Sequence, residues 1–153
     1  MQPLKPILLI EDDNVDTMTV KRAMRDLHVG YSVMHSVNGE EAMKYLTNPD
    51  NEKPFVILLD LNMPKMGGIE FLKVIKAHHE LKTIPIVVLT TSGEKRDILE
   101  SFELGAAGYM VKPVDYSKFV ETLGKIMMYW SISELPKPEL MTAEIHRKPN
   151  APF

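Results

Sequence analysis

The chain has 153 residues, enough for one domain with a sizeable core and too few for two domains of ordinary size. Its 21 acidic and 18 basic side chains give a net charge of -3, which argues against nucleic acid or an anionic membrane surface as a direct partner. There is no cysteine, so disulfides, thiolate metal sites and thiol catalysis are excluded. Residues 1–5 are too short and polar for a signal peptide, and no apolar run approaches the roughly 18 residues of a membrane span, so a cytoplasmic location is expected.

Short apolar runs alternate with longer amphipathic stretches along the chain. This alternation is typical of βα units, in which helices join parallel strands. The expected strands are residues 6–10, 31–36, 55–59, 86–90 and 109–111. The sequence therefore predicts an α/β domain with helices on both faces of a five-stranded parallel sheet.

The first two helices have recognisable ends. The first should begin after the acidic residues 11–13, whose charges suit a helix N-terminus, and end near Gly30. Asn38 suits the N-cap of the second helix, which residues 48–49 should end.

The other three helices follow the remaining strands. Gly67 precedes the third, the fourth covers about residues 95–104, and Asp115 suits the N-cap of the fifth. The fifth helix should bury one apolar face, made of Phe119, Val120, Leu123, Ile126 and Met127.

The composition changes from Leu135 onward. Four prolines lie among charged residues there, without a sustained apolar period: Pro136, Pro138, Pro149 and Pro152. We therefore expect one folded domain over residues 1–135 and a flexible or partner-binding tail over residues 136–153.

Polar side chains stand at the ends of four of the five expected strands. Glu11 and Asp12 follow the first, Asp60 follows the third, Thr90 ends the fourth and Lys112 follows the fifth. The carboxyl ends of parallel strands meet at one edge of a sheet, so these side chains should gather there. A carboxylate nucleophile, acids that can hold a metal, a hydroxyl and an ammonium are the groups needed to transfer a phosphoryl group.

The three acids are expected to hold a cation. Crowded carboxylates repel one another, so Glu11, Asp12 and Asp60 can all be charged only with a cation between them. Oxygen ligands and a phosphoryl substrate point to Mg²⁺, with the backbone carbonyl of Asn62 as a further ligand.

Each of these signals alone also has a structural explanation. An acidic pair after a strand often caps a helix, and Lys112 with Pro113 often marks a turn. All four motifs in order at one sheet edge favour the functional interpretation. Asp13 is a weaker candidate ligand than the acids beside it, and Asp16 is expected on a solvated helix face.

The sequence resembles the CheY-like receiver domain of two-component response regulators over about residues 6–130. The resemblance rests on residues 11–12, the run Asp60-Leu61-Asn62-Met63-Pro64, Thr90 and the pair Lys112-Pro113. It implies a flavodoxin-like (βα)5 fold, a doubly wound sheet with strand order 2-1-3-4-5. Residues 127–136 also resemble the helix end of single-domain regulators associated with phytochrome-type histidine kinases.

The resemblance assigns a role to each residue at the sheet edge. Asp60 would accept a phosphoryl group from a phosphohistidine. Asp12 and Asp60 would bind Mg²⁺ directly, and Glu11 would act mainly through water. Lys112 would neutralise the phosphoryl charge, and its bond to Pro113 would be cis.

The resemblance also implies a conformational switch. Thr90 would move toward the phosphoryl group while Tyr109 becomes buried. Asn62 and Ser92 occupy the positions at which side chains tune phosphoryl hydrolysis in this family.

The expected function is therefore that of a stand-alone response regulator in a two-component phosphorelay. Such a protein is not an enzyme but a phosphoacceptor that takes part in its own phosphotransfer and dephosphorylation. The expected partners are a sensor histidine kinase of phytochrome type, a histidine phosphotransfer protein or another response regulator, and a second copy of the chain. Output is expected through protein contact, because the tail is too short for a DNA-binding domain.

Two large aromatics near the end of the last helix have two open interpretations. Tyr129 and Trp130 could close the core, or they could anchor a dimer or partner contact.

Two other functions fit the pattern less well. A phosphoaspartyl hydrolase resembling the haloacid dehalogenases would need a second acid two places after Asp60, where Asn62 stands, and a cap insertion. A flavodoxin-like FMN carrier would need a phosphate loop rich in Ser, Thr and Gly after the first strand. Turnover of small phosphate esters, or a bound flavin spectrum, would identify either one.

Overall fold

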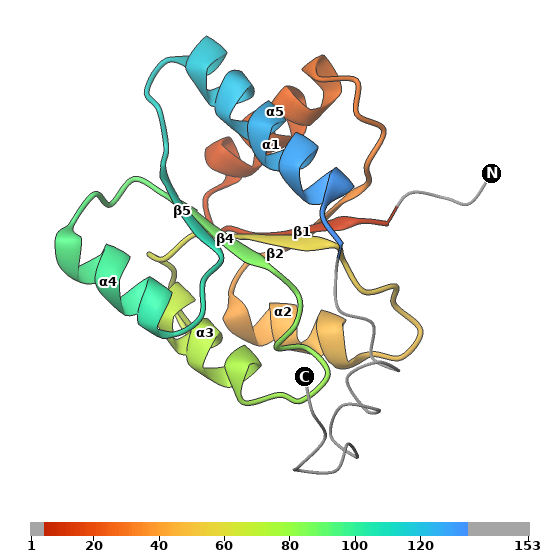
Figure 1. The fold of residues 1–153 in the computed structure, drawn as a ribbon, viewed down its shortest axis with the longest axis vertical. Coiled ribbons are helices and arrows are strands. Elements are labelled where there is room, and N and C mark those ends of the chain that lie inside the picture. Colours follow the sequence, from red (N-terminus) through yellow and green to blue (C-terminus); the bar gives the residue numbers. More distant parts are fainter. Residues whose placement is uncertain (1–4, 135–153) are drawn as a thin grey trace, which may run out of the picture.

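Within residues 5–134, which the computed structural model describes, five parallel strands form one sheet in the order β2-β1-β3-β4-β5 (Figure 1). The strands are β1 (Ile7–Ile10), β2 (Val33–Ser36), β3 (Val56–Leu59), β4 (Ile86–Thr90) and β5 (Gly108–Val111). The helices are α1 (Asn14–Asp26), α2 (Gly39–Thr47), α3 (Gly68–Lys76), α4 (Lys95–Glu103) and α5 (Tyr116–Ile132). The predicted flavodoxin-like fold and its strand order are confirmed.

The helices cover both faces of the sheet. α1 and α5 lie on one face, and α2, α3 and α4 lie on the other (Figure 1). Strand side chains alternate in direction, so Ile7 and Leu9 join the core under α1 and α5, whereas Leu8 and Ile10 join the core on the opposite face. Because both faces are covered, β1, β3 and β4 are buried along their whole length.

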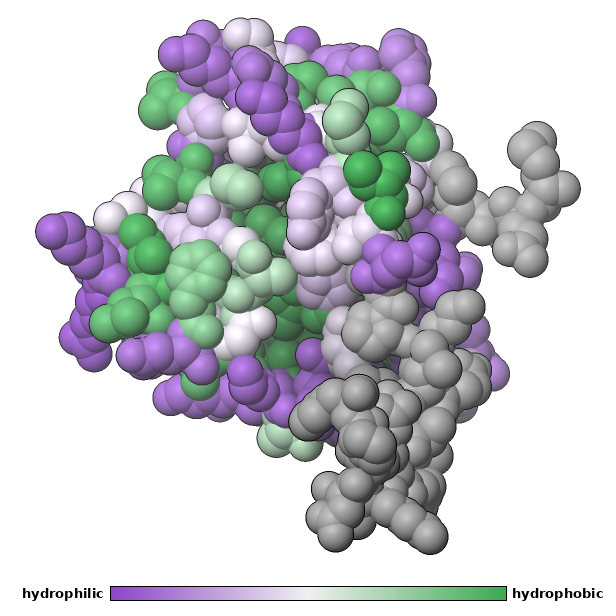
Figure 2. Space-filling view, in the orientation of Figure 1, coloured by the Kyte–Doolittle hydropathy of each residue, from purple (hydrophilic) through white to green (hydrophobic). Residues whose placement is uncertain are grey.

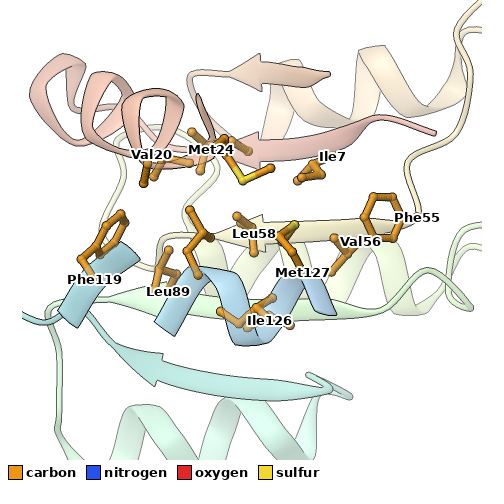
Figure 3. Close-up of a cluster of buried hydrophobic side chains, with 14 residues drawn as sticks. Ile7, Val20, Met24, Phe55, Val56, Leu58, Leu89, Phe119, Ile126 and Met127 are labelled. Atoms are coloured by element: carbon orange, nitrogen blue, oxygen red, sulfur yellow. The ribbon is translucent and has the colours of Figure 1, made fainter. Parts of the chain in front are cut away.

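The core between the sheet and the α1 and α5 pair fixes the position of the last helix (Figure 3). Val20 and Met24 of α1 pack in the same cluster as the inward side chains of α5. The predicted buried face of α5 is confirmed, since Phe119, Leu123, Ile126 and Met127 are at most 5% exposed and Val120 is partly buried.

Side-chain caps fix where three helices begin. Asp13 caps α1, Asn38 caps α2 and Asp115 caps α5, and each accepts a hydrogen bond from a backbone N–H in the first turn. The predicted caps of α2 and α5 are confirmed. Asp13 serves as a helix cap beside the acidic pair, in line with its lower rank as a ligand.

Two predicted elements are longer than the observed ones. α1 ends at Asp26 rather than near Gly30, because His28 (φ 53°) and Gly30 (φ 76°) adopt left-handed backbone conformations that end a helix. β2 begins at Val33 rather than at Tyr31, whose ring packs against Phe55 with centroids 4.8 Å apart.

The predicted tail, residues 136–153, lies outside the described residues. None of the helices between residues 5 and 134 has the length and apolar character needed to cross a bilayer.

Candidate functional site

Backbone hydrogen bonds hold the strand ends of the site in register. The N–H of Asp60 donates to the carbonyl of Ile10 at 3.0 Å, which places Asp60 beside the end of β1. The N–H of Lys112 donates to the carbonyl of Thr90 at 2.7 Å, which places Lys112 beside the end of β4. The parallel sheet therefore brings together groups that lie far apart in the sequence.

The three predicted metal ligands meet at this edge. Glu11, Asp12 and Asp60 each offer a carboxylate oxygen, and these oxygens lie within 4.8 Å of one another. Glu11 is 2% exposed and Asp60 is 7% exposed, whereas Asp12 faces solvent. Three carboxylates so close together are a suitable donor set for a hard divalent cation, which keeps part of its water shell on the exposed side.

Burial changes the acidity of two of these groups. It raises the pKa of Glu11 to about 7, although the neighbouring Lys112 opposes the change. Burial also raises the pKa of Asp60, while Lys112, the Thr90 hydroxyl and the Asn62 backbone oppose that rise. A divalent cation at the cluster would favour the charged carboxylates and so offset the cost of burying them.

The Lys112 ammonium forms two ion pairs at the site. Its Nζ lies 3.0 Å from Oε2 of Glu11 and 3.2 Å from Oδ2 of Asp16. Burial lowers the pKa of Lys112, but the hydrogen bond to Glu11 and the charges of Glu11, Asp60 and Asp16 raise it, with a net increase. Asp16 is partly exposed on α1, with 42% of its side chain accessible, as expected for a solvated helix face. Its ion pair with Lys112 was not foreseen from the sequence.

The bond between Lys112 and Pro113 is trans, as are all peptide bonds between residues 5 and 134. The predicted cis isomer is therefore not found. Trans is the default before proline, by about 0.5–1 kcal/mol.

The two predicted switch residues lie on neighbouring strands. Thr90 is fully buried, and its hydroxyl has no hydrogen-bond partner within residues 5–134, although it lies near enough to Asp60 to lower the pKa of that carboxyl. Tyr109 is partly buried, and its hydroxyl donates to the carbonyl of Ser92 at 2.8 Å. That bond ties β5 to the loop between β4 and α4. Whether the two residues move together stays a prediction.

The two residues predicted to tune phosphoryl hydrolysis have different surroundings. Asn62 is exposed in the loop after β3. The Ser92 hydroxyl donates to Oδ2 of Asp97, in the first turn of α4, at 2.6 Å. This contact was not foreseen, because nothing in the local sequence pairs the two residues. Their effect on hydrolysis stays a prediction.

A close approach behind Asp60 explains Gly68, to which the sequence interpretation gave no role. A Cβ at Gly68 would lie 2.6 Å from the backbone oxygen of Asp60 and 2.6 Å from Cα of Leu61. α3 can begin against the loop after β3 only because this residue lacks a side chain. The signal available in the sequence was a second glycine directly after Gly67.

The two aromatics at the end of α5 have different surroundings, and each fits a different one of the two interpretations, core closure and partner contact. Trp130 is partly buried and packs against the core under α1 and α5. Tyr129 is 59% exposed and meets the Trp130 ring edge to face, with centroids 4.7 Å apart. Trp130 therefore closes the core, and Tyr129 is the residue left available for a dimer or partner contact.

The fold and the acidic site define a class of protein. Residues 7–124 match the response regulator receiver domain family, and the chain belongs to that family. The predicted resemblance is confirmed.

Individual relatives show which response regulators the chain resembles in sequence and in structure. The chain is 34% identical over 132 residues to response regulator Rcp1 of Synechocystis sp., an alignment that covers 84% of this chain and 90% of Rcp1. The crystal structure of the phosphorylated cyanobacterial phytochrome response regulator RcpA superposes with a TM-score of 0.80 at 36% identity, covering 87% of this chain and 99% of RcpA. The Mn²⁺-bound form of Rcp1 superposes with a TM-score of 0.79 at 33% identity, covering 88% of this chain and all of the Rcp1 chain. The chain is therefore similar to phytochrome-associated response regulators.

Proposed function

We propose that the protein is a stand-alone response regulator whose Asp60 accepts a phosphoryl group from a histidine kinase. The observation that carries this proposal is the placement of Asp60 within 4.8 Å of two further acids, at the strand ends that also present Thr90 and Lys112. The chain aligns with 90% of Rcp1 and 99% of RcpA, which are response regulators, and this likeness supports the proposed role.

The chemistry requires one bond to form and one to break. A carboxylate oxygen of Asp60 attacks phosphorus, the bond from phosphorus to the kinase histidine breaks, and the nitrogen keeps the electron pair. Lys112 and Thr90 would then donate hydrogen bonds to the phosphoryl oxygens, where negative charge is concentrated. The protein is thus an acceptor that takes part in its own phosphorylation and dephosphorylation, and not an enzyme with turnover.

Mg²⁺ fits the donor set. Glu11, Asp12, Asp60 and the backbone carbonyl of Asn62 would hold it. When bound, the ion supplies positive charge that balances the phosphoryl oxygens and keeps the carboxylates ionised. The related regulator Rcp1 has a Mn²⁺-bound form, which supports binding of a divalent ion by this chain as well.

The switch would begin at Thr90. Its buried hydroxyl has no partner among the described residues, so a phosphoryl group on Asp60 would give it one. Inverting a population from 1:99 to 99:1 requires roughly 5.5 kcal/mol. Hydrogen bonds to charged groups contribute about 1.5–3 kcal/mol each, so contacts from Lys112 and Thr90 would supply much of it. Tyr109 would move together with Thr90, because its hydroxyl already donates to the Ser92 carbonyl in the loop after β4.

Output would pass through protein contacts at what we call the α4–β5–α5 surface. Its exposed apolar side chains are Leu99, Phe102, Met110, Val111, Met128, Tyr129 and Ile132. Figure 2 shows apolar side chains gathered over the part of this face where α4 and β5 lie. We propose that this surface forms a homodimer. The phosphoryl donor would be a phytochrome-type histidine kinase, and the onward partner would be a histidine phosphotransfer protein or another response regulator. The protein would act in the cytoplasm.

The proposed function can be tested with a small phosphoryl donor. Acetyl phosphate with Mg²⁺ should add one phosphoryl group to the wild type, as measured by intact mass, and EDTA should prevent it. Asp60→Ala should remain unmodified, whereas Asp50→Ala, which removes an exposed aspartate after α2, should react like the wild type. An adduct that persists in Asp60→Ala would contradict the proposed acceptor.

A further inference from the structure

The Lys112 ammonium is held by two acids that differ in burial. The Glu11 side chain is 3% exposed and the Asp16 side chain is 42% exposed. Among the described residues Lys112 makes no ion pair with Asp60, although the charges of the two groups influence each other. The ammonium therefore rests on the α1 side of the pocket rather than on the phosphoacceptor.

We propose that Asp16 is a positioning residue for phosphotransfer, whose carboxylate on α1 holds the Lys112 ammonium back from Asp60. The inference rests on the proposed function of Asp60. It assigns to Asp16 a role that is separate from metal binding, because Asp16 is not part of the carboxylate cluster at Glu11, Asp12 and Asp60.

The difference in burial decides which contact Lys112 gives up. When the ammonium turns toward a phosphoryl group, water can solvate the half-exposed Asp16 carboxylate, so that contact is lost at little cost. The Glu11 side chain is 3% exposed, so water cannot take the place of the ammonium there and this contact is harder to break. The ion pair between Lys112 and Asp16 is therefore the one that breaks first when the ammonium moves.

The surroundings allow this movement. Asp16 and Lys112 line one groove between α1 and the segment that leads into α5, together with Thr19, Val114 and Tyr116. The Lys112 side chain is 10% exposed, so a short reorientation within this groove does not require the core to open.

The test compares initial rates of phosphorylation by acetyl phosphate with Mg²⁺, measured by intact mass. Asp16→Asn should react about two- to fivefold faster than the wild type, the range expected when one partly exposed ion pair no longer has to be broken. Asp16→Glu, which keeps the carboxylate, should react at nearly the wild-type rate. Glu94→Gln is the matched control, because Glu94 is an exposed acid in the loop after β4 and its loss removes the same charge.

A second arm separates positioning from a general structural effect. In a Lys112→Met background, Asp16→Asn should leave the residual rate unchanged, because Asp16 acts through the lysine. Circular dichroism and urea unfolding verify that each variant is folded.

Each outcome supports or overturns the proposed role of Asp16. A rate for Asp16→Asn that is equal to or below the wild-type rate overturns it, as does an equal acceleration in Glu94→Gln or in the Lys112→Met background. A wild type that takes up no phosphoryl group overturns the proposed function itself and this inference with it, and that failure is visible before any variant is compared.

Discussion

At the scale of single residues, the site depends on a carboxyl that burial makes a weak acid. Glu11 is almost fully buried, and burial raises its pKa to about 7. In its charged form it needs the Lys112 ammonium, 3.0 Å away, or a metal ion. The charge state of this one side chain therefore links stability, pH and metal binding.

We expect the free energy of unfolding in EDTA to fall as the pH rises from 4.5 to about 7. In this window the folded protein keeps the proton of Glu11, whereas an unfolded glutamate has lost it near pH 4.5. Above about pH 7 both states are ionised and this contribution levels off. At 1.36 kcal/mol for each pH unit, the contribution of Glu11 is about 3 kcal/mol.

Urea unfolding over this pH range measures the effect. Saturating Mg²⁺ should reduce the decline, because the ion stabilises the charged form. Glu11→Gln should flatten the decline in EDTA, since the amide does not titrate. An equally steep decline in Glu11→Gln would show that another group is responsible.

Gly68 gives a second prediction at this scale. Gly68→Ala should destabilise the protein by more than about 1 kcal/mol, because its Cβ would meet backbone atoms of Asp60 and Leu61 at 2.6 Å. Gly93→Ala is the control, since its Cβ would lie 3.9 Å from the nearest atom, a side-chain carbon of Val111. Denaturant midpoints of the two variants should differ clearly, and equal midpoints would contradict the close approach.

The residue-level contacts show what the sequence could and could not predict. The clustering of Glu11, Asp12 and Asp60 followed from strand ends in a parallel sheet, which is a rule of backbone topology. The pairing of Asp16 with Lys112 and of Ser92 with Asp97 depends on side-chain reach across elements. No local pattern encodes such contacts, so the sequence predicts the partly exposed position of Asp16 but not its ion pair with Lys112.

At the scale of elements, α5 has two faces with different tasks. Its inner face packs against α1 and the sheet, whereas Met128, Tyr129 and Ile132 are exposed. Helical periodicity alone predicted the inner face, because apolar residues at spacings of three and four define one side of a helix. It did not decide between Tyr129 and Trp130, which are adjacent and both aromatic.

Leu123→Ala should lower the free energy of unfolding by about 2–5 kcal/mol, because the side chain is 1% exposed within the core. Met128→Ala, on the same helix but 69% exposed, should change it by less than about 0.5 kcal/mol. Urea unfolding of both variants checks the assignment of the two faces. Similar losses in both would mean that the outer face is also packed, as it would be in a tight dimer.

At the scale of the whole molecule, the sheet joins the acidic site at its strand ends to the α4–β5–α5 surface, through which we propose that output passes. Lys112 directly follows β5, whereas Tyr109 and the exposed Met110 and Val111 lie within it. The five-stranded parallel sheet was predictable, because short apolar runs alternate with amphipathic stretches and clear helix ends separate them. The strand order followed from the resemblance to receiver domains. The homodimer stays a prediction, because exposed apolar residues alone do not identify the partner that covers them.

If the α4–β5–α5 surface forms the homodimer, Ile132→Ser should weaken it. Ile132 is 79% exposed, and losing an apolar anchor of an interface should raise the dimer dissociation constant about tenfold. Met18→Ser is the matched control, since Met18 is 68% exposed on α1, away from that surface. Light scattering over a dilution series measures both, and a larger effect of Met18→Ser would place the interface on α1.

The most direct test of the central claim is to locate the phosphoryl group after reaction with acetyl phosphate and Mg²⁺. Borohydride reduces an aspartyl phosphate to homoserine, which peptide sequencing by mass spectrometry can assign to one position. We predict homoserine at position 60 and at no other aspartate. Homoserine at Asp12 or Asp13, or a phosphorylated protein without homoserine at position 60, would contradict Asp60 as the phosphoacceptor.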